Sequence, residues 1–147
     1  MKKLPAFAKL YLRLSIGAGY LVFGLDRLGV WGKPGGKNIS WGDWAHFVKY
    51  ARELMGFLPP SLAEVLAVLA TIAEISIGTL LLLGIWTRVA AVGSGVLSLL
   101  FALSMAISFG LVSPLSYSVF TLSAASFLLA ACSEGRPINP SPGREKA

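Results

Sequence analysis

Charged residues are scarce in this sequence. Only 14% of its 147 side chains are charged, whereas 55% are hydrophobic. A soluble domain needs a larger polar surface, so this composition excludes an ordinary soluble globular protein. The charges that are present cluster near the termini and in one internal stretch, and the long apolar runs carry almost none. This distribution is typical of a protein that crosses a membrane several times.

Cysteine and histidine each occur once, at Cys132 and His46. One residue of each type cannot build a His and Cys metal cluster or a two-cysteine redox relay, so we predict no metal site. The sequence also lacks a haem-ligand pair and a nucleotide-binding fingerprint, so we predict no intrinsic cofactor and assign no catalytic residue. The net charge of +6 is explained by charges flanking the spans and by anionic lipid, and we expect no nucleic-acid partner.

Four apolar runs predict an all-α membrane protein, a four-helix transmembrane bundle. We place the spans at about residues 5–28, 62–83, 89–109 and 115–131. A helix needs roughly 20 residues to cross about 30 Å of hydrocarbon, and the fourth run is shorter. Ser113 and Pro114 are suited to begin that helix as N-cap and first residue. A cleaved signal peptide is the main alternative for the first run, but Arg13 interrupts its apolar core and favours an anchor.

Basic residues set the expected orientation. Positive charges are more numerous on cytoplasmic than on external loops, so both termini are predicted to be cytoplasmic, with loop 29–60 periplasmic and a cytoplasmic tail at 132–147. The two groups of basic residues compared are Lys2, Lys3, Lys9, Arg88, Arg136, Arg144 and Lys146 on the inner side, and Arg27, Lys33, Lys37, Lys49 and Arg52 on the outer side.

An amphipathic helix is expected within the loop between the first two spans. Ser40 and Asp43 have the spacing of a capping box, and Pro59 and Pro60 end the segment. The apolar positions at helical spacing are Trp41, Trp44, Val48, Ala51, Met55 and Leu58. We expect this face to lie on the membrane interface, either as an anchor rich in aromatic residues or as a lid over an opening in the bundle.

Arg13 and Glu74 lie inside predicted spans, where an ionised side chain costs about 2.5–3.5 kcal/mol or more. Counted from the inner ends of their helices, the two residues lie at depths of about 12 and 14 Å, because each helical residue rises 1.5 Å. We therefore predict an ion pair between them, in which the guanidinium retains donors for a ligand. The alternative is a buried pair that only fixes helix registry.

Further polar residues share faces with this predicted pair. The sets of the first three spans recur at helical spacing, so small residues would allow close helix packing while polar residues meet inside the bundle. The sets are Arg13, Gly17, Tyr20, Gly24 and Arg27 in the first span, Glu64, Ala67, Thr71, Glu74 and Gly78 in the second, Ser94, Ser98, Met105 and Ser108 in the third, and Tyr117, Thr121 and Ser123 in the fourth.

Three of the charged residues also have a structural interpretation. Glu64 follows Ser61 by three residues and could complete a capping box. Asp26 and Arg27 lie near the outer end of the first span, where charged side chains can extend into the headgroup region. The candidate ligand-binding residues are Arg13, Glu74, Tyr20, Thr71, Arg27 and Glu64.

The pattern resembles the DoxX-like family. The resemblance rests on Arg13, on Gly24 to Arg27, on Glu74 to Gly78, and on the stretch Leu83-Gly84-Ile85-Trp86-Thr87-Arg88 that leads into the third span. It implies a small four-span protein of the bacterial inner membrane, similar to subunits of thiosulfate:quinone oxidoreductase. This sequence has Arg27 where lysine is frequent in the family, and its first loop is longer and rich in tryptophan.

Three functional hypotheses follow from the sequence and the resemblance. In the first, the protein is an accessory subunit of quinone-linked oxidoreduction in which Arg13 and Glu74 hold a quinone headgroup, and electrons come from a partner subunit or a soluble donor. In the second, it is a noncatalytic membrane scaffold or small-molecule-binding subunit. A small transporter is the third and weaker hypothesis, because no inverted repeat is evident, and formation of a homo-oligomer would favour it.

Overall fold

The computed structural model describes residues 4–133, and every regular element in that range is a helix. The predicted tail, beyond Ser133, and the basic residues Lys2, Lys3, Arg136, Arg144 and Lys146 therefore lie outside the described residues. The helices are α1 (Ala6–Asp26), α2 (Trp44–Leu54), α3 (Pro60–Leu83), α4 (Thr87–Phe109), α5 (Val112–Ser116) and α6 (Val119–Cys132).

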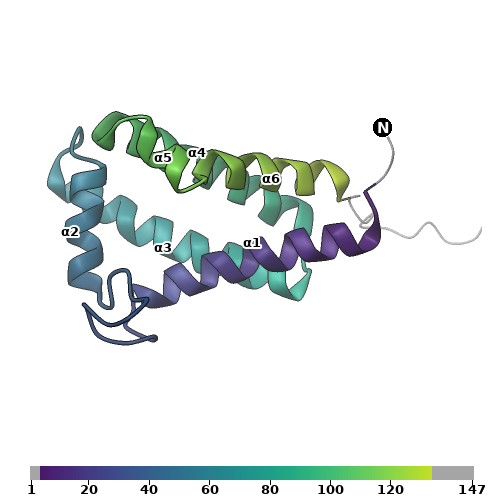
Figure 1. Ribbon diagram of the computed structural model, residues 1–147, viewed down its shortest axis with the longest axis horizontal. Coiled ribbons are helices and arrows are strands. Elements are labelled where there is room, and N and C mark those ends of the chain that lie inside the picture. Colours follow the sequence, from purple (N-terminus) through teal and green to yellow (C-terminus); the bar gives the residue numbers. More distant parts are fainter. Residues whose placement is uncertain (1–3, 134–147) are drawn as a thin grey trace, which may run out of the picture.

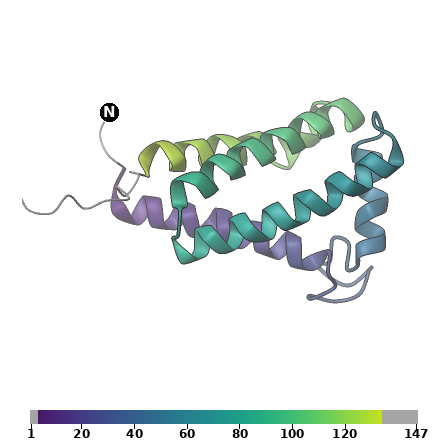
Figure 2. The same ribbon diagram turned by 180° about the vertical axis from the view of Figure 1, so that it is seen from behind.

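The helices form two antiparallel pairs. α1 packs mainly against α3, and α4 packs mainly against α6 (Figures 1 and 2). A short turn joins α3 to α4 at one end of the bundle, and α2 lies across the opposite end, in contact with both α3 and α4. The start of α1 and the end of α6 lie together at the end away from α2 (Figure 1). This placement is the one expected for an even number of membrane crossings.

Three helices, α1, α3 and α4, are long and apolar enough to cross a membrane. The fourth predicted span, 115–131, corresponds to two helices, because Ser118 takes a left-handed conformation (φ 56°) that separates α5 from α6. α6 has only 14 residues, fewer than the roughly 20 that span the hydrocarbon core. The expected start at Ser113 and Pro114 is wrong, because α5 begins at Val112 and Leu111 is its N-cap. A fourth crossing stays a prediction.

The surface of the long helices is apolar. Large side chains such as Val65, Ile72, Leu100 and Ile107 are each more than half exposed. Soluble monomers rarely expose extended apolar surface, whereas helices in a bilayer present such side chains to lipid. The interior holds small and polar residues as well as apolar ones, with Ala90, Ala91, Ser94 and Ser98 all buried. Small interior residues let helix backbones approach closely, as is common in membrane bundles.

The closest approach of α1 and α3 is at Gly17 and Gly78. A Cβ atom built on Gly78 would lie 3.0 Å from the Gly17 carbonyl oxygen and 3.0 Å from Leu21 Cγ. The two helix backbones lie close together at this crossing, so a side chain at either position would require its neighbours to shift by a few tenths of an ångström. The predicted close packing of these two helix faces is confirmed, and the crossing fixes the register of α1 against α3.

We expect Gly78→Val to lower the free energy of unfolding by about 1–3 kcal/mol, because the added methyl groups overpack the α1–α3 crossing. Gly19→Ala is the matched control, since a Cβ atom at Gly19 would meet nothing within 4 Å. The control is expected to be neutral or slightly stabilising, because alanine favours helix more than glycine does. Denaturant titration in mild detergent, followed by circular dichroism, measures both. Equal stability of the two variants would contradict the proposed register.

Candidate functional site

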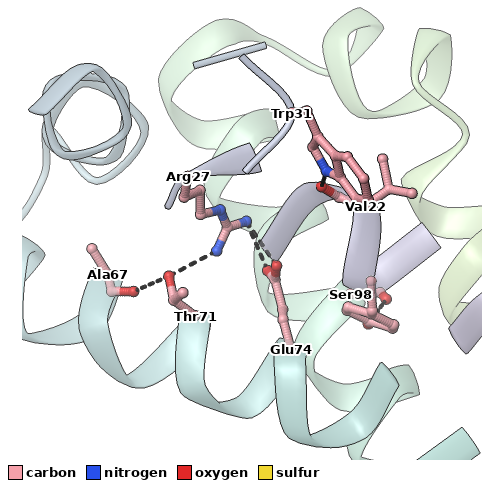
Figure 3. Close-up of polar contacts among 8 residues, drawn as sticks. Val22, Arg27, Trp31, Ala67, Thr71, Glu74 and Ser98 are labelled. Atoms are coloured by element: carbon pink, nitrogen blue, oxygen red, sulfur yellow. Dashed lines mark hydrogen bonds and ion pairs between the residues drawn. The ribbon is translucent and has the colours of Figure 1, made fainter. Parts of the chain in front are cut away.

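Arg27 and Glu74 form a buried ion pair. Arg27 Nη2 lies 3.0 Å from Glu74 Oε1 and 2.8 Å from Oε2, so one terminal nitrogen binds both carboxylate oxygens (Figure 3). Arg27 Nη1 donates to the Thr71 hydroxyl at 3.0 Å, and that hydroxyl donates to the Ala67 carbonyl oxygen at 2.8 Å. Each charged residue is only 3% exposed. The predicted faces of α1 and α3 therefore meet, and three of the six candidate residues come together here.

The arginine that pairs with Glu74 is Arg27, and the predicted pairing with Arg13 is wrong. The antiparallel crossing at Gly17 and Gly78 places residues that precede Gly17 beside residues that follow Gly78. Arg13 accordingly lies against Gly84, where any side chain would collide with its guanidinium group. The predicted pairing would require the inner ends of α1 and α3 to be level, whereas α3 ends opposite Arg13.

The sequence suggested that Asp26 and Arg27 extend into the headgroup region, but in the structure both residues are buried. Asp26 is 3% exposed, and its Oδ2 atom accepts hydrogen bonds from the backbone N–H groups of Ser40 at 3.2 Å and Trp41 at 2.8 Å. The loop after α1 thus folds back over the end of that helix and covers both charges. This contact joins residues 14 and 15 positions apart, which helix periodicity cannot reveal.

Aromatic rings cover the guanidinium group. Arg27 Cζ lies 3.9 Å from the centroid of the Phe47 ring and 5.1 Å from that of Trp41. A cation over an aromatic face is attracted by the electrons of the ring, and the attraction grows when water is excluded. Trp41 packs in turn against Phe47, with ring centroids 5.2 Å apart. The buried pair is therefore sealed by residues of α2 and of the loop before it.

α2 faces the bundle rather than the membrane interface that we expected. Its buried residues are Phe47, Ala51 and Leu54, on one helical face against α3 and α4. Phe47 and Leu54 were absent from the predicted apolar stripe, although their spacing from Ala51 would have revealed them. This placement agrees with a lid over the end of the bundle.

The N-cap of α2 is Asp43, not Ser40. The Asp43 carboxylate accepts a hydrogen bond from the backbone N–H of His46 at 2.8 Å, which lowers the pKa of Asp43. His46 thus has a structural role at this cap, as expected from its solitary occurrence.

Glu64 does not complete a capping box with Ser61, because Pro59 is the N-cap of α3 and no side chain caps that helix. Glu64 instead forms an ion pair with Arg52 of α2. The Glu64 side chain is 42% exposed, so this contact fastens α2 to α3 outside the buried site.

Tyr20 belongs to a second polar cluster. Its hydroxyl donates to the Ser94 carbonyl oxygen at 3.0 Å and lies 2.7 Å from the Ser98 hydroxyl. The Ser94 hydroxyl lies 2.7 Å from that of Ser126. These contacts connect α1, α4 and α6 and confirm the buried serine face of α4.

Of the three residues that we expected to face inward from the fourth span, one is buried and two are exposed. Ser123 is buried and donates to the Gly95 carbonyl oxygen at 2.7 Å. Tyr117 is 76% exposed and Thr121 is also exposed, so their predicted inward placement is wrong. The break in the helix at Ser118 changes which residues face inward.

An apolar cavity of about 360 Å³ lies between α2, α3 and α4. Ser104 contributes a hydroxyl to its otherwise apolar lining, and Phe47 and Ala67 belong to both the cavity and the surroundings of the ion pair. Small-molecule sites have volumes of roughly 300–1,000 Å³ and combine apolar walls with a few polar groups. The arrangement can therefore hold a mainly apolar ligand next to a buried charged pair.

The described residues do not suggest a metal centre. Within residues 4–133, no group of three or more His, Cys, Asp or Glu side chains lies close enough together to hold a metal ion. The polar groups of this site are the side chains of Arg27, Thr71 and Glu74.

Fold and site together define a helical membrane protein with a buried arginine–glutamate pair beneath a covering helix. The DoxX family model matches residues 8–107, more than half of the chain, and the protein belongs to the DoxX family. The matched range contains Arg27, Thr71 and Glu74 and ends before α5 and α6. No curated protein and no solved structure matches the chain.

We expect Arg27→Met and Glu74→Met each to lower the free energy of unfolding by about 3–5 kcal/mol, because either change leaves a buried charge without its partner. The double variant should lose less than the sum of the two losses. Denaturant titration of all four proteins in detergent gives this coupling energy.

Arg52 and Glu64 provide the matched control pair, because they are about half exposed. Exposed pairs contribute about 1 kcal/mol or less, so the same cycle with Arg52→Met and Glu64→Met should give a small coupling. A coupling at Arg27 and Glu74 no larger than that of the control pair would show that the buried contact does not form.

Proposed function

We propose that this DoxX-family membrane protein binds a quinone beneath α2 and acts as an accessory subunit of quinone-linked oxidoreduction. The observation that carries the proposal is the apolar cavity next to the buried Arg27–Glu74 pair, with Phe47 shared by both. A quinone has matching parts, since its ring carries carbonyl oxygens and its tail is apolar. The cavity suits the tail and the faces of the ring, and the charged pair suits the carbonyl groups.

Arg27 has a hydrogen-bond donor to offer. Among the described residues, no partner accepts from its Nε atom, although that atom is buried. A buried donor without an acceptor is costly, so a ligand oxygen that accepts from it would be favoured. A charged donor also makes a stronger hydrogen bond to a carbonyl oxygen than a neutral donor does. Arg27 is therefore the residue that we assign to hold the quinone carbonyl.

Glu74 is assigned to proton exchange. Reduction of a quinone to a quinol consumes two electrons and two protons, and oxidation of the quinol releases them. A carboxylate near the ring can accept or supply one proton at a time. The electrons come from a partner oxidoreductase subunit or a soluble donor, and the protein acts as one part of a larger enzyme.

The second candidate function is a noncatalytic membrane scaffold. It is favoured by the completeness of the pair, because Glu74 is bound through both oxygens and Arg27 through both terminal nitrogens. Such a pair can serve to fix helix registry alone. Retention of quinone separates the two candidates, since a scaffold has no need of it.

We further propose an inner-membrane location with both termini cytoplasmic, which puts α2 and the cavity on the periplasmic side. Lys9 and Arg88, near the starts of α1 and α4, lie at the end of the bundle away from α2. Lys33, Lys37 and Lys49 belong to the loop and helix at the other end. Most of the positive charge that we assign to the cytoplasmic side comes from Lys2 and Lys3 and from the basic residues of the tail.

We expect wild-type protein purified in mild detergent to retain quinone, and Glu74→Gln to retain at least about tenfold less, equivalent to about 1.4 kcal/mol of binding. Glutamine keeps an oxygen that accepts from Arg27 but leaves the guanidinium group without a counter-charge, so we expect the variant to be less stable than the wild type, and retention is compared between folded proteins. Mass spectrometry of extracted small molecules measures the retention, and circular dichroism checks the fold.

Glu64→Gln is the control, because it is the same substitution on the same helix and lies outside the buried site. This variant should retain quinone like the wild type. If all three folded proteins hold equal amounts, or none holds any after incubation with ubiquinone and menaquinone, the quinone proposal is wrong and the scaffold function gains support.

A further inference from the structure

Phe47 stands between the cavity and the ion pair. Its ring centroid lies 3.9 Å from Arg27 Cζ, and the same residue lines the apolar cavity. Phe47 is 2% exposed and lies one helical turn before Ala51, another residue that lines the cavity. A molecule in the cavity must therefore pass this ring, or take its place, to reach the guanidinium group.

The Phe47 ring is held over Arg27 by a cation–π contact. An aromatic face over a guanidinium group is a favourable arrangement, particularly where water is excluded. Trp41 and Trp44 pack against Phe47 with ring centroids 5.2 and 5.4 Å away. Aromatic rings of the protein thus enclose the Arg27 guanidinium group, and of the two rings that lie over it, Phe47 is the one that also lines the cavity.

The cavity is open to the apolar surface of the bundle. Its lining includes Leu69 and Leu100, which are 55% and 57% exposed. Both residues lie in long apolar helices, α3 and α4, whose outer surfaces face hydrocarbon. A lipid-soluble molecule can reach the cavity sideways from the bilayer without crossing the headgroup region, and it meets Phe47 at the inner side of the cavity.

We propose that Phe47 is a gate that covers Arg27 until a ligand enters from the cavity. This inference rests on the proposed quinone function and adds to it the residue that controls access to Arg27. The quinone enters from the cavity, displaces the Phe47 side chain and brings a carbonyl oxygen within hydrogen-bond distance of the Arg27 Nε donor. Its apparent affinity is reduced by the fraction of molecules in which Phe47 covers Arg27.

The contacts of α2 indicate that the side chain moves while the helix stays in place. The Arg52–Glu64 ion pair fastens α2 to α3. Ser108 of α4 donates to the Leu54 carbonyl oxygen at 2.7 Å, and Asp26 holds the loop that leads to α2. With both ends of α2 fastened, rotation of the Phe47 side chain is the smallest movement that opens the path.

Trp41 provides a direct probe of the site. It lies 5.1 Å from Arg27 Cζ, and quinones quench tryptophan fluorescence at short range. We would retain Trp41, change Trp31, Trp44 and Trp86 to Phe, and titrate the protein in lipid nanodiscs with a short-chain benzoquinone. In this background, Phe47→Leu should lower the apparent Kd by about three- to tenfold and speed the onset of quenching.

Phe23→Leu is the matched control. The Phe23 ring also packs against Trp41, at 6.1 Å between centroids, but Phe23 neither lines the cavity nor covers Arg27. The control should bind within about twofold of its parent, because the fraction of molecules with Arg27 covered is unchanged. Phe47→Met is the second variant, since methionine keeps most of the volume without a ring and should also tighten binding.

The possible outcomes distinguish failure of the Phe47 gate from failure of the proposed quinone function. If the parent binds quinone and folded Phe47→Leu and Phe47→Met bind no more tightly than Phe23→Leu, the gate is refuted and the quinone site stands. Quenching that is weak in the parent and strong in both Phe47 variants supports the gate. If no variant quenches in a saturable way, the gate and the proposed function fail together.

Discussion

The backbone contact between α1 and α3 at Gly17 and Gly78 is the constraint on which the site depends. Because glycine at both positions lets the two backbones approach closely, this crossing sets the antiparallel register of α1 against α3. That register brings Arg27 level with Thr71 and Glu74 and places Arg13 ten residues further along α3, beside Gly84. A shift by one helical turn would separate the carboxylate from its partner and leave two buried charges uncompensated, at a cost of several kcal/mol.

The ion pair explains in turn the shape of the loop and of α2. A buried guanidinium group at the end of α1 must be shielded from water. The loop after α1 shields it by folding back onto Asp26, which places Trp41 beside Arg27. Phe47 completes the cover from α2. Polar and aromatic groups thus neutralise and enclose one charged pair, and the apolar cavity lies immediately outside that enclosure.

The helical faces could be predicted from the sequence, because helix periodicity is local. The small and polar faces of α1 and α3, with Gly17, Thr71 and Glu74 pointing inward, are confirmed by their burial. The DoxX family was recognised from motifs in the same helices, and the family match confirms it. Site composition was therefore partly predictable, as Thr71, Glu74 and Arg27 were all among the candidate residues.

The pairing within the site was not predictable, because it depends on how far one helix slides along another. Helix ends are a poor guide to that offset, and counting from them selected Arg13. The roles of Asp26 and Phe47 depend on contacts between segments distant in sequence. The kink at Ser118 has a comparable effect, since a single residue with positive φ changes the inward face of the helix that follows. Local periodicity places Phe47 on the same helical face as Ala51, but it contains no information on the offset between two helices, on contacts between distant segments or on the break at Ser118.

The positions of the two partners along the chain also bear on how the protein is assembled in the membrane. Arg27 is synthesised 47 residues before Glu74, so α1 enters the bilayer while its future partner is still being made. At the end of α1, the long arginine side chain can reach the headgroups during this interval. Arrival of α3 then draws the guanidinium inward. Because Arg27 is at the helix end, its charge costs less during this interval than the roughly 2.5–3.5 kcal/mol of a charge at the centre of the bilayer.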